Sequence, residues 1–277
     1  MFSIVSFNIW NVWRLTRRAW NRDDLAAEVI RELFPDVLCL QEFDGPFRHE
    51  EVSLPQMLSP DYAEVPVADV PPDDNWNPIF YRAERFRAVA GGHHVYSAGT
   101  EYPYRGKKYR SHFRTLTWGV IERRENGTLC AVVNTHYDTD QANLKSESDE
   151  LIGVCLNLER QYHCPVLVAG DYNCVPAGTA VQNMLAHGFR DTCPLAKHRE
   201  EHMGCHPYPI LNEEKQLYDR YDDHFYHTAY KDAIDHVLLL GDAEVELYRT
   251  VMNEKTFLIS DHSPVLVEMT FPTVRKI

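Results

Sequence analysis

The sequence lacks the features that would place the chain in a membrane or in a disulfide framework. No segment approaches the roughly 18 uninterrupted apolar residues that a membrane-spanning helix needs. The seven cysteines are odd in number and form no Cys-x-x-Cys pair, which argues against a disulfide set or a zinc ribbon. The first residues carry no basic region ahead of an apolar stretch, so they do not resemble a signal peptide. We therefore expect a cytoplasmic protein with reduced, mostly buried thiols.

Positive charge is also scarce, with 28 Lys and Arg residues against 41 Asp and Glu residues and a formal net charge of −13. A surface this acidic repels nucleic acid at long range, so we do not expect tight non-specific binding to DNA. A local basic rim is still compatible with this balance. The densest basic run contains Arg105, Lys107, Lys108 and Arg110. Such a run is either solvated on a free loop or in contact with phosphates of a substrate.

What the chain does contain is an alternation of strand-like and helix-like segments. Its 277 residues show no internal repeat, low-complexity tract or linker-like shift of composition, so we expect one domain over residues 1–277. Apolar patterning predicts helices at 23–33, 141–162 and 177–187, and strands at 2–7, 36–41, 77–81, 86–96, 115–123, 128–135, 165–170, 233–240, 244–248 and 264–271.

Three local features refine this prediction. The strands at 77–81 and 86–96 resemble a meander, and Glu125-Asn126-Gly127 favours a hairpin turn between the next two strands. Asp140 is a candidate cap for the longest helix. The stretches 97–113 and 194–231 follow no periodic pattern, and long segments of this kind are usually functional or mobile loops. We expect substrate specificity to reside in them.

Polar side chains occur where the predicted strands begin or end. They are Asn8, Glu42, His136, Asp171, Asn173, Asp235, Asp261 and His262. Strand ends at one edge of a packed sheet can meet in a single cleft, where a rigid scaffold holds the side chains. Carboxylates bind hard cations, amides ligate a metal or donate to phosphate, and a histidine beside an acid can shuttle a proton. These types suit hydrolysis of a phosphate ester, which needs charge neutralisation and a water aimed in line with the leaving group.

Six motifs in order resemble the signatures of one superfamily. SFNIW, LCLQEF, NTHYD, AGDYNCVP, AIDHVLL and LISDHSPV are similar to those of the endonuclease/exonuclease/phosphatase superfamily of metal-dependent phosphohydrolases, and the resemblance spans residues 3–267. Each motif alone is weak, whereas six in the right order are specific. The resemblance implies an α/β fold, a four-layer α/β/β/α sandwich of two mostly antiparallel sheets with outer helices. The active site would lie at one end of the sandwich.

The same resemblance implies roles for the polar residues. Glu42 corresponds to the main metal ligand, Asn8 to its neighbour in the metal shell and Asp261 to a further metal-side acid, with Mg²⁺ or Mn²⁺ as the cofactor. Asp171 corresponds to the acid that orients or deprotonates the attacking water. Asn173 and His136 correspond to donors to the phosphate. His262 corresponds to the catalytic histidine and Asp235 to the carboxylate that polarises it. Arg114 matches a phosphate-contacting arginine of deoxyribonuclease-like members.

Some residues allow a plainer interpretation. His236 stands where many members of the superfamily have an aromatic residue, and we expect it to point away from Asp235 and to be structural. A nucleophilic serine, Ser260 or Ser263, is disfavoured because no Gly-x-Ser-x-Gly elbow is present. None of the other histidines shows a zinc spacing, and most of them should be structural or exposed. The aromatic and basic residues that follow the first strand either pack or form one wall of the cleft; they are Trp10, Trp13, Arg14, Arg17, Arg18 and Trp20.

Three functions compete at this point. The first is a metal-dependent hydrolase acting on a phosphodiester or a small phosphorylated molecule, which the net charge favours over long duplex DNA. The second is a nuclease in which local basic loops overcome that charge. The third is a binding module that lost catalysis, and it ranks low because every expected member of the metal, Asp and His set is present. Oligomeric state, the number of metal ions and the division of labour between Asp171 and His262 stay open.

Overall fold

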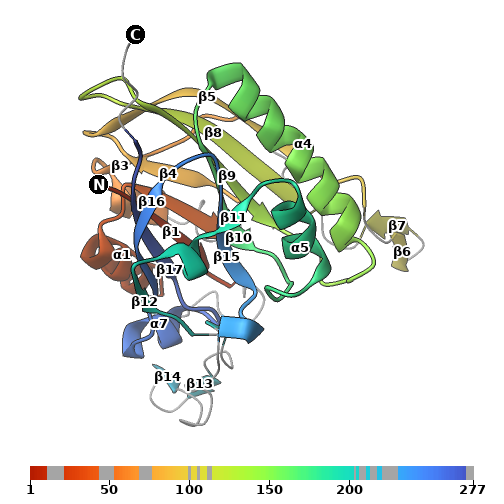
Figure 1. Cartoon of the computed structure of the whole chain (residues 1–277). Coiled ribbons are helices and arrows are strands. Elements are labelled where there is room, and N and C mark those ends of the chain that lie inside the picture. The colour runs from red at the N-terminus through yellow and green to blue at the C-terminus, as the bar shows by residue number, and fades with distance from the viewer. Residues whose placement is uncertain are drawn as a thin grey trace.

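The structure, a computed structural model, describes residues 1–10, 22–43, 53–68, 77–98, 101–104, 107–110, 114–202, 204–205, 210–212, 217–219 and 230–272. Two β-sheets face each other, and helices cover their outer sides (Figure 1). This arrangement confirms the predicted α/β/β/α sandwich. Among the helices described, none has the length and apolar character to cross a lipid bilayer.

The first sheet has seven strands in the order β12-β16-β17-β1-β2-β4-β3. Their bounds are β12 His198–Glu200, β16 Glu244–Thr250, β17 Val265–Thr270, β1 Phe2–Asn8, β2 Val37–Gln41, β4 Ile79–Arg82 and β3 Tyr62–Glu64. The pairs β1·β2 and β12·β16 are parallel, and the other four pairs are antiparallel. Strands β1 and β2 are buried along nearly their whole length, as expected for strands that are covered on both faces.

The second sheet has six strands in the order β11-β15-β10-β9-β8-β5. Their bounds are β11 Arg190–Asp191, β15 Asp235–Leu240, β10 Val166–Asp171, β9 Leu129–His136, β8 Thr115–Arg123 and β5 Phe86–Val95. Only the pair β9·β10 is parallel within this sheet. The hairpin between β8 and β9 turns at the predicted place, where Gly127 has a φ of 73° that suits a glycine.

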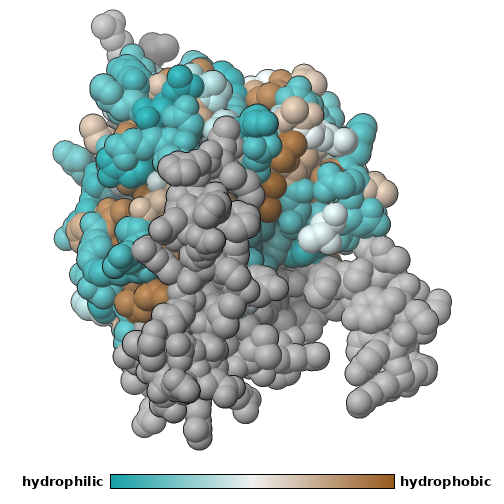
Figure 2. Space-filling model, turned by 90° about the horizontal axis from the view of Figure 1, so that it is seen from below, coloured by the Kyte–Doolittle hydropathy of each residue, from teal (hydrophilic) through white to brown (hydrophobic). Residues whose placement is uncertain are grey.

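The helices are α1 Arg22–Leu33, α3 Leu54–Leu58, α4 Leu144–Tyr162, α5 Thr179–Ala186, α6 Thr192–Leu195 and α7 Glu254–Ile259, with a 3₁₀ turn at Tyr230–Asp232. Two short hairpins stand apart from the main sheets: β6 Glu101–Tyr104 with β7 Lys107–Arg110, and β13 Ile210–Asn212 with β14 Leu217–Asp219. Seen from below, the described surface is mainly hydrophilic, and its apolar residues appear in small separate groups (Figure 2).

Three layers of apolar side chains hold the sandwich together. The middle layer joins the sheets, with Ile4 and Val37 from one and Val132 and Leu167 from the other. One outer layer packs α1 against the first sheet, and the other packs α4 and α5 against the second sheet. Burial of this apolar area from water is the main stabilising contribution to the fold.

The structure corrects two of the local predictions. Strands β4 and β5 do not form a meander, because β4 pairs with β2 and β3 while β5 pairs with β8 in the opposite sheet. Asp140 does not cap α4, whose N-cap is Asn143; the Asp140 side chain instead accepts a hydrogen bond from the Ala142 amide within a preceding turn. The two stretches without a pattern contain β6, β7 and the strands β12 to β14.

Candidate active site

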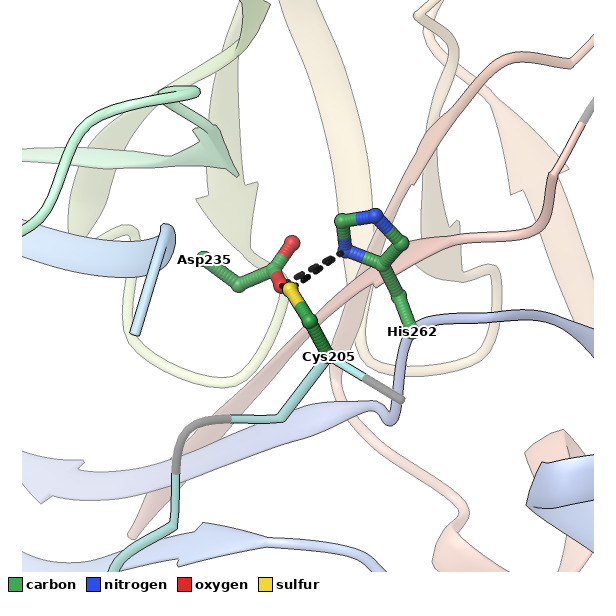
Figure 3. A group of neighbouring side chains, drawn as sticks. All are labelled: Cys205, Asp235 and His262. Atoms are coloured by element: carbon green, nitrogen blue, oxygen red, sulfur yellow. Dashed lines mark hydrogen bonds and ion pairs between the residues drawn. The ribbon is translucent and has the colours of Figure 1, made fainter. Parts of the chain in front are cut away.

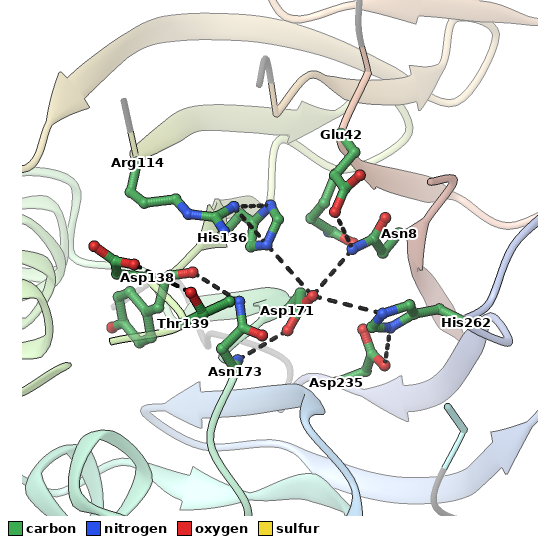
Figure 4. A network of polar contacts seen from close by, with 12 residues as sticks. Asn8, Glu42, Arg114, His136, Asp138, Thr139, Asp171, Asn173, Asp235 and His262 are labelled. Atoms are coloured by element: carbon green, nitrogen blue, oxygen red, sulfur yellow. Dashed lines mark hydrogen bonds and ion pairs between the residues drawn. The ribbon is translucent and has the colours of Figure 1, made fainter. Parts of the chain in front are cut away.

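The ends of strands from both sheets bring the predicted site residues to one end of the sandwich (Figure 4). In the parallel pair β9·β10, His136 stands opposite Asp171, and in the antiparallel pair β10·β15, Asp171 stands opposite Asp235. In the other sheet, the parallel pair β1·β2 aligns Asn8 with Gln41, directly before Glu42. Because parallel strands end at the same edge of a sheet, this register gathers side chains that are far apart in sequence.

The position of Asp171 depends on the glycine before it. At Gly170, a Cβ atom would clash with the carbonyl oxygen of Thr135 on the neighbouring strand. The absence of a side chain therefore allows β9 and β10 to approach closely and keeps Asp171 level with His136. A substitution at Gly170 would have to displace backbone atoms at the site.

A buried amide pair joins the two sheets beneath the site. Gln41 donates from Nε2 to Oδ1 of Asn134 over 2.7 Å, and Asn134 in turn donates to the backbone oxygens of Leu40 and Pro78 at 2.8 Å each. Both side chains are fully buried, where such bonds are costly to leave unmade. This link fixes the strand that carries Glu42 relative to the strand that carries His136.

His262 and Asp235 form a buried pair. Nδ1 of His262 lies 2.8 Å from Oδ2 of Asp235, and Nε2 of His262 lies 3.8 Å from Oδ2 of Asp171. Burial on its own lowers the pKa of His262, but the Asp235 carboxylate outweighs it and holds that pKa well above the usual range for histidine. The pair therefore favours a charged imidazole that faces Asp171.

Asp171 is the hub of the site. Its Oδ2 accepts a hydrogen bond from Nδ2 of Asn8 at 3.0 Å and lies 3.4 Å from Nε2 of His136, while its Oδ1 accepts the backbone N–H of Asn173 at 2.8 Å. Burial raises the pKa of Asp171 to about 6, with the nearby charge of Asp235 acting in the same direction and that of His262 opposing it. Such a carboxyl group is tuned to exchange a proton near neutral pH.

Asn8, Glu42 and Asp261 lie on the side of the first sheet. Nδ2 of Asn8 also donates to Oε1 of Glu42 over 3.2 Å, and Oδ1 of Asn8 accepts the backbone N–H of Trp10. The amide nitrogen of Asn8, not its oxygen, is thus turned toward the carboxylates. Burial raises the pKa of Asp261, and the charge of Glu42 adds to this effect although that of His262 opposes it. The carboxylates of Glu42 and Asp261 therefore lie close enough to affect each other's charge.

Backbone strain is concentrated around the same residues. Among the described residues, five non-glycine residues have positive φ, and three of them, Trp10, Glu42 and Asn173, follow strands that end at the site. A glutamate with φ of 56° is unusual, since this region suits glycine, asparagine and aspartate. Strain of this kind is typically retained where function needs a particular placement.

Arg114 and His136 form the opposite wall. Nη1 of Arg114 lies 2.6 Å from Nε2 and 2.8 Å from Nδ1 of His136, and both residues are buried. The backbone oxygen of Arg114 accepts the N–H of Tyr96. In the sequence, the β6·β7 hairpin therefore lies between two residues whose backbones are hydrogen-bonded to each other. Asn173 donates from Nδ2 to the backbone oxygen of Tyr137 at 2.8 Å.

The structure brings together all nine residues predicted from the sequence. Two residues that adjoin them in the sequence, His236 and Ser260, make other contacts. Nε2 of His236 lies 2.8 Å from the Cys174 carbonyl and its Nδ1 lies 3.4 Å from the hydroxyl of Tyr230, contacts that Asp235 does not share. Ser260 donates to the backbone oxygen of Asn8, which ties β1 to the start of β17. Trp10 is described, whereas Trp13, Arg14, Arg17, Arg18 and Trp20 lie outside the described residues.

One residue at the site was not predicted from the sequence. Cys205 forms an isolated antiparallel bridge with His262, and its Sγ lies 3.7 Å from Nδ1 of that histidine. Burial raises the pKa of the Cys205 thiol to about 11. A single cysteine inside a segment without periodicity carries no signal that could have identified it.

Comparison with known proteins supports one family. A family model described as the Endonuclease/Exonuclease/phosphatase family matches residues 6–262. No curated protein matches the sequence closely enough to count as a relative.

Similar solved structures include a mannosyl-6-phosphatase from Bacteroides thetaiotaomicron, with 20% identity, a TM-score of 0.74 and coverage of 98% of this chain and 100% of that one. A protein of the same family from Bacteroides vulgatus has 19% identity, a TM-score of 0.72 and coverage of 98% and 99%. The catalytic domain of human Nocturnin with bound sulfate has 18% identity, a TM-score of 0.66 and coverage of 98% and 94%. Likeness at this level of identity shows the fold.

Proposed function

Because the chain belongs to the endonuclease/exonuclease/phosphatase family, whose members hydrolyse phosphate esters, we propose that it is a divalent-metal-dependent hydrolase of a small phosphorylated molecule. The observation that carries this proposal is the convergence on Asp171 of Asn8, His136 and His262, which come from the ends of β1 and β9 and from the segment before β17. Phosphoryl transfer depends mainly on positioning and electrostatic stabilisation, which a rigid constellation of this kind supplies.

The donor set on the first sheet fits a hard cation. Glu42 and Asp261 supply carboxylate oxygens, and the raised pKa of Asp261 reflects burial together with an unfavourable charge from Glu42 that a cation would relieve. Asn8 fits as a ligand only if its amide rotates, because its oxygen now accepts the Trp10 N–H. When bound there, Mg²⁺ or Mn²⁺ would neutralise phosphate charge and stabilise the leaving oxygen.

Asp171 and His262 are the groups proposed to handle the proton. Asp171 is held by Asn8 and by the Asn173 backbone, so its carboxylate can orient an attacking water. His262, held by Asp235 and kept charged, can hydrogen-bond to a non-bridging oxygen or protonate the leaving group.

The phosphate itself is proposed to bind between the two sheets. Arg114 and His136 supply donors from one wall, and a guanidinium recognises phosphate oxygens well because of its planar fork of N–H groups. The amide nitrogen of Asn173 carries two hydrogens, of which one is used at Tyr137, so the other can reach a phosphate oxygen.

Two observations support a small phosphorylated substrate. The formal net charge of −13 opposes long-range attraction of a polyanion. A protein of the same fold is described as a mannosyl-6-phosphatase, and another was solved with bound sulfate, a tetrahedral anion that resembles phosphate. A phosphorylated sugar is therefore the first substrate class to test.

A nuclease is the second candidate, and one feature favours it. The β6·β7 hairpin contains Lys107, Lys108 and Arg110 and precedes Arg114 in the chain, so the sequence has a local excess of positive charge close to this site residue. A neighbour of the same fold, from zebrafish, was solved with a single-stranded DNA product, at 14% identity.

A substrate panel with added metal separates these candidates. The purified protein is assayed with sugar phosphates, inositol phosphates, a choline phospholipid, oligonucleotides and plasmid DNA, each with Mg²⁺, Mn²⁺ or EDTA. We expect turnover of a small phosphate ester that EDTA stops and added metal restores. Turnover of oligonucleotides alone would establish the nuclease instead, and metal-independent turnover would contradict the proposed role of the cation. The Asp171→Asn variant controls for contaminating phosphatases.

A further inference from the structure

A second group of potential metal-binding side chains is formed by the proposed catalytic pair, Asp235 and His262, together with Cys205. Sγ of Cys205 lies 3.7 Å from Nδ1 of His262 and 3.9 Å from Oδ2 of Asp235, and the latter two atoms are 2.8 Å apart (Figure 3). Within the described ranges of the chain, this is the one group of three or more His, Cys, Asp or Glu residues whose ligand atoms all lie within 4.8 Å of one another.

The chemistry of this group differs from that of Glu42 and Asp261. A thiolate, an imidazole and a carboxylate are the ligands of zinc, whereas Mg²⁺ takes oxygen ligands. A second observation points to a ligand here. Asp235 is only 2% exposed, and its buried Oδ1 has no hydrogen-bond partner among the residues that the structure describes. A buried carboxylate oxygen without a partner is rare, and a cation held by both oxygens of the Asp235 carboxylate would satisfy it.

The spacing is close to that of a tetrahedral zinc site. With metal bonds of about 2.3 Å to sulfur and about 2.0–2.2 Å to nitrogen and oxygen, sulfur lies about 3.6 Å from each of the other two ligands. The Sγ distances of 3.7 and 3.9 Å are near this value. The Nδ1 to Oδ2 distance of 2.8 Å must open to about 3.4 Å. Entry of the metal therefore replaces the hydrogen bond between His262 and Asp235.

We propose that Cys205, Asp235 and His262 form an inhibitory site for Zn²⁺, separate from the oxygen-donor site of the activating cation. Binding releases the thiol proton of Cys205 and any proton on Nδ1 of His262, because both atoms must be deprotonated to ligate the metal. The bound ion takes the place of the proton that joins His262 to Asp235. His262 can then no longer be held as a charged group facing Asp171.

The binding part of this inference stands on the geometry alone, whereas the inhibition rests on the proposed function. Cys205 is also the accessible thiol for such a site. It is partly exposed, while the other six cysteines are buried. A thiol-sensitive probe of bound metal should therefore report mainly on Cys205.

Cadmium, which resembles zinc and gives an ultraviolet sulfur-to-metal charge-transfer band, tests the binding directly. The metal-free full chain is titrated with Cd²⁺, and Zn²⁺ is then added to compete. We expect a saturable band at one equivalent that Zn²⁺ removes, that is absent in Cys205→Ser, and that is retained in the matched control Cys164→Ser. In His262→Ala, the affinity for Cd²⁺ should fall at least about tenfold, since one ligand is lost.

Two results would overturn the proposal. One is a wild-type protein that shows no charge-transfer band, and the other is a Cys205→Ser variant that keeps it. Circular dichroism checks that each variant is folded, and His262→Ala supplies an independent readout if Cys205→Ser does not fold.

Inhibition is measured as the Zn²⁺ concentration that halves turnover at saturating Mg²⁺, compared within each variant to its own uninhibited rate. We expect that concentration to rise at least about tenfold in Cys205→Ser and to stay unchanged in Cys164→Ser. Equal zinc sensitivity in all three proteins would contradict the inhibitory role. A protein that binds cadmium through Cys205 but hydrolyses no phosphate ester would refute the proposed function and leave the metal site standing.

Discussion

Nδ1 of His262 lies 2.8 Å from Oδ2 of Asp235, although the two residues are 27 positions apart in the sequence. Asp235 is the first residue of β15 in the second sheet, and His262 lies three residues before β17 of the first sheet. This contact joins the start of β15 to the segment that precedes β17, across the end of the sandwich. Asp171, in the second sheet, lies next to His262 and accepts a hydrogen bond from Asn8 of the first sheet (Figure 4). The chemistry of the site therefore depends on how the two sheets are packed.

His262→Ala should reduce turnover by about 10²–10⁴-fold, the usual contribution of a proton-transferring group. The fold should be retained, as measured by circular dichroism. His187→Ala, which removes an exposed histidine at the end of α5, serves as the control and should keep the wild-type rate. A His262→Ala variant with normal turnover would exclude a catalytic role for this histidine.

Asp171→Asn should lose most turnover without losing stability. Burial raises the pKa of Asp171 to about 6, so ionising this group in the folded protein costs free energy at pH 7, and the neutral amide removes that cost. The melting temperature should therefore equal or exceed that of the wild type. Asp149→Asn, at an exposed position on α4, is the matched control. A variant that melts well below the wild type would show that Asp171 is mainly structural.

Glu42→Ala should raise the Mg²⁺ concentration needed for half-maximal turnover by at least about tenfold, because a carboxylate ligand is lost. The measurement is a metal titration at saturating substrate. Glu28→Ala, an exposed glutamate on α1, should leave the titration unchanged. An unchanged metal requirement in Glu42→Ala would remove this residue from the ligand set.

Arg114→Lys should reduce kcat/KM by roughly 10- to 100-fold, because an ammonium group lacks the planar fork that binds two phosphate oxygens. Steady-state kinetics on the substrate found in the panel measure the change. The exposed residue Arg160 of α4 offers the same substitution as a control. If Arg114→Lys behaves like Arg160→Lys, the arginine does not contact substrate.

Glu147→Gln should change how stability depends on pH. Burial raises the pKa of Glu147 to about 7 from its usual 4.5, and the side chain accepts the backbone N–H of Asp138. The folded state therefore binds a proton more tightly than the unfolded state does. The contribution of Glu147 is neutral below pH 4.5 and becomes destabilising as pH rises toward 7.

Glutamine keeps the acceptor for Asp138 without this titration. Relative to the wild type, Glu147→Gln should gain roughly 1–3 kcal/mol in free energy of unfolding at pH 8 and little at pH 4. Urea unfolding at both pH values measures the difference, with the exposed Glu159→Gln as control. A difference that is the same at both pH values would show that Glu147 does not titrate as described.

Local sequence patterns determined much of this protein. The apolar runs of β1, β2 and β10 and the stripe of α4 could be read directly, because periodicity is a property of a single element. The polar residues at strand ends could be identified in the same way, and their order indicated the family. The predicted cap at Asp140 was wrong because a nearby turn competes for the same side chain.

Only the tertiary structure decided which of these residues meet and how. Asn8 and Asp171 are 163 positions apart, and no local pattern shows that the amide nitrogen of Asn8 faces the carboxylate. Cys205 reaches His262 through a bridge formed by a segment without periodicity. Strands β4 and β5 separate into different sheets because burial of apolar faces, not chain proximity, selects their partners. Contacts between distant segments depend on the packing of the two sheets as a whole.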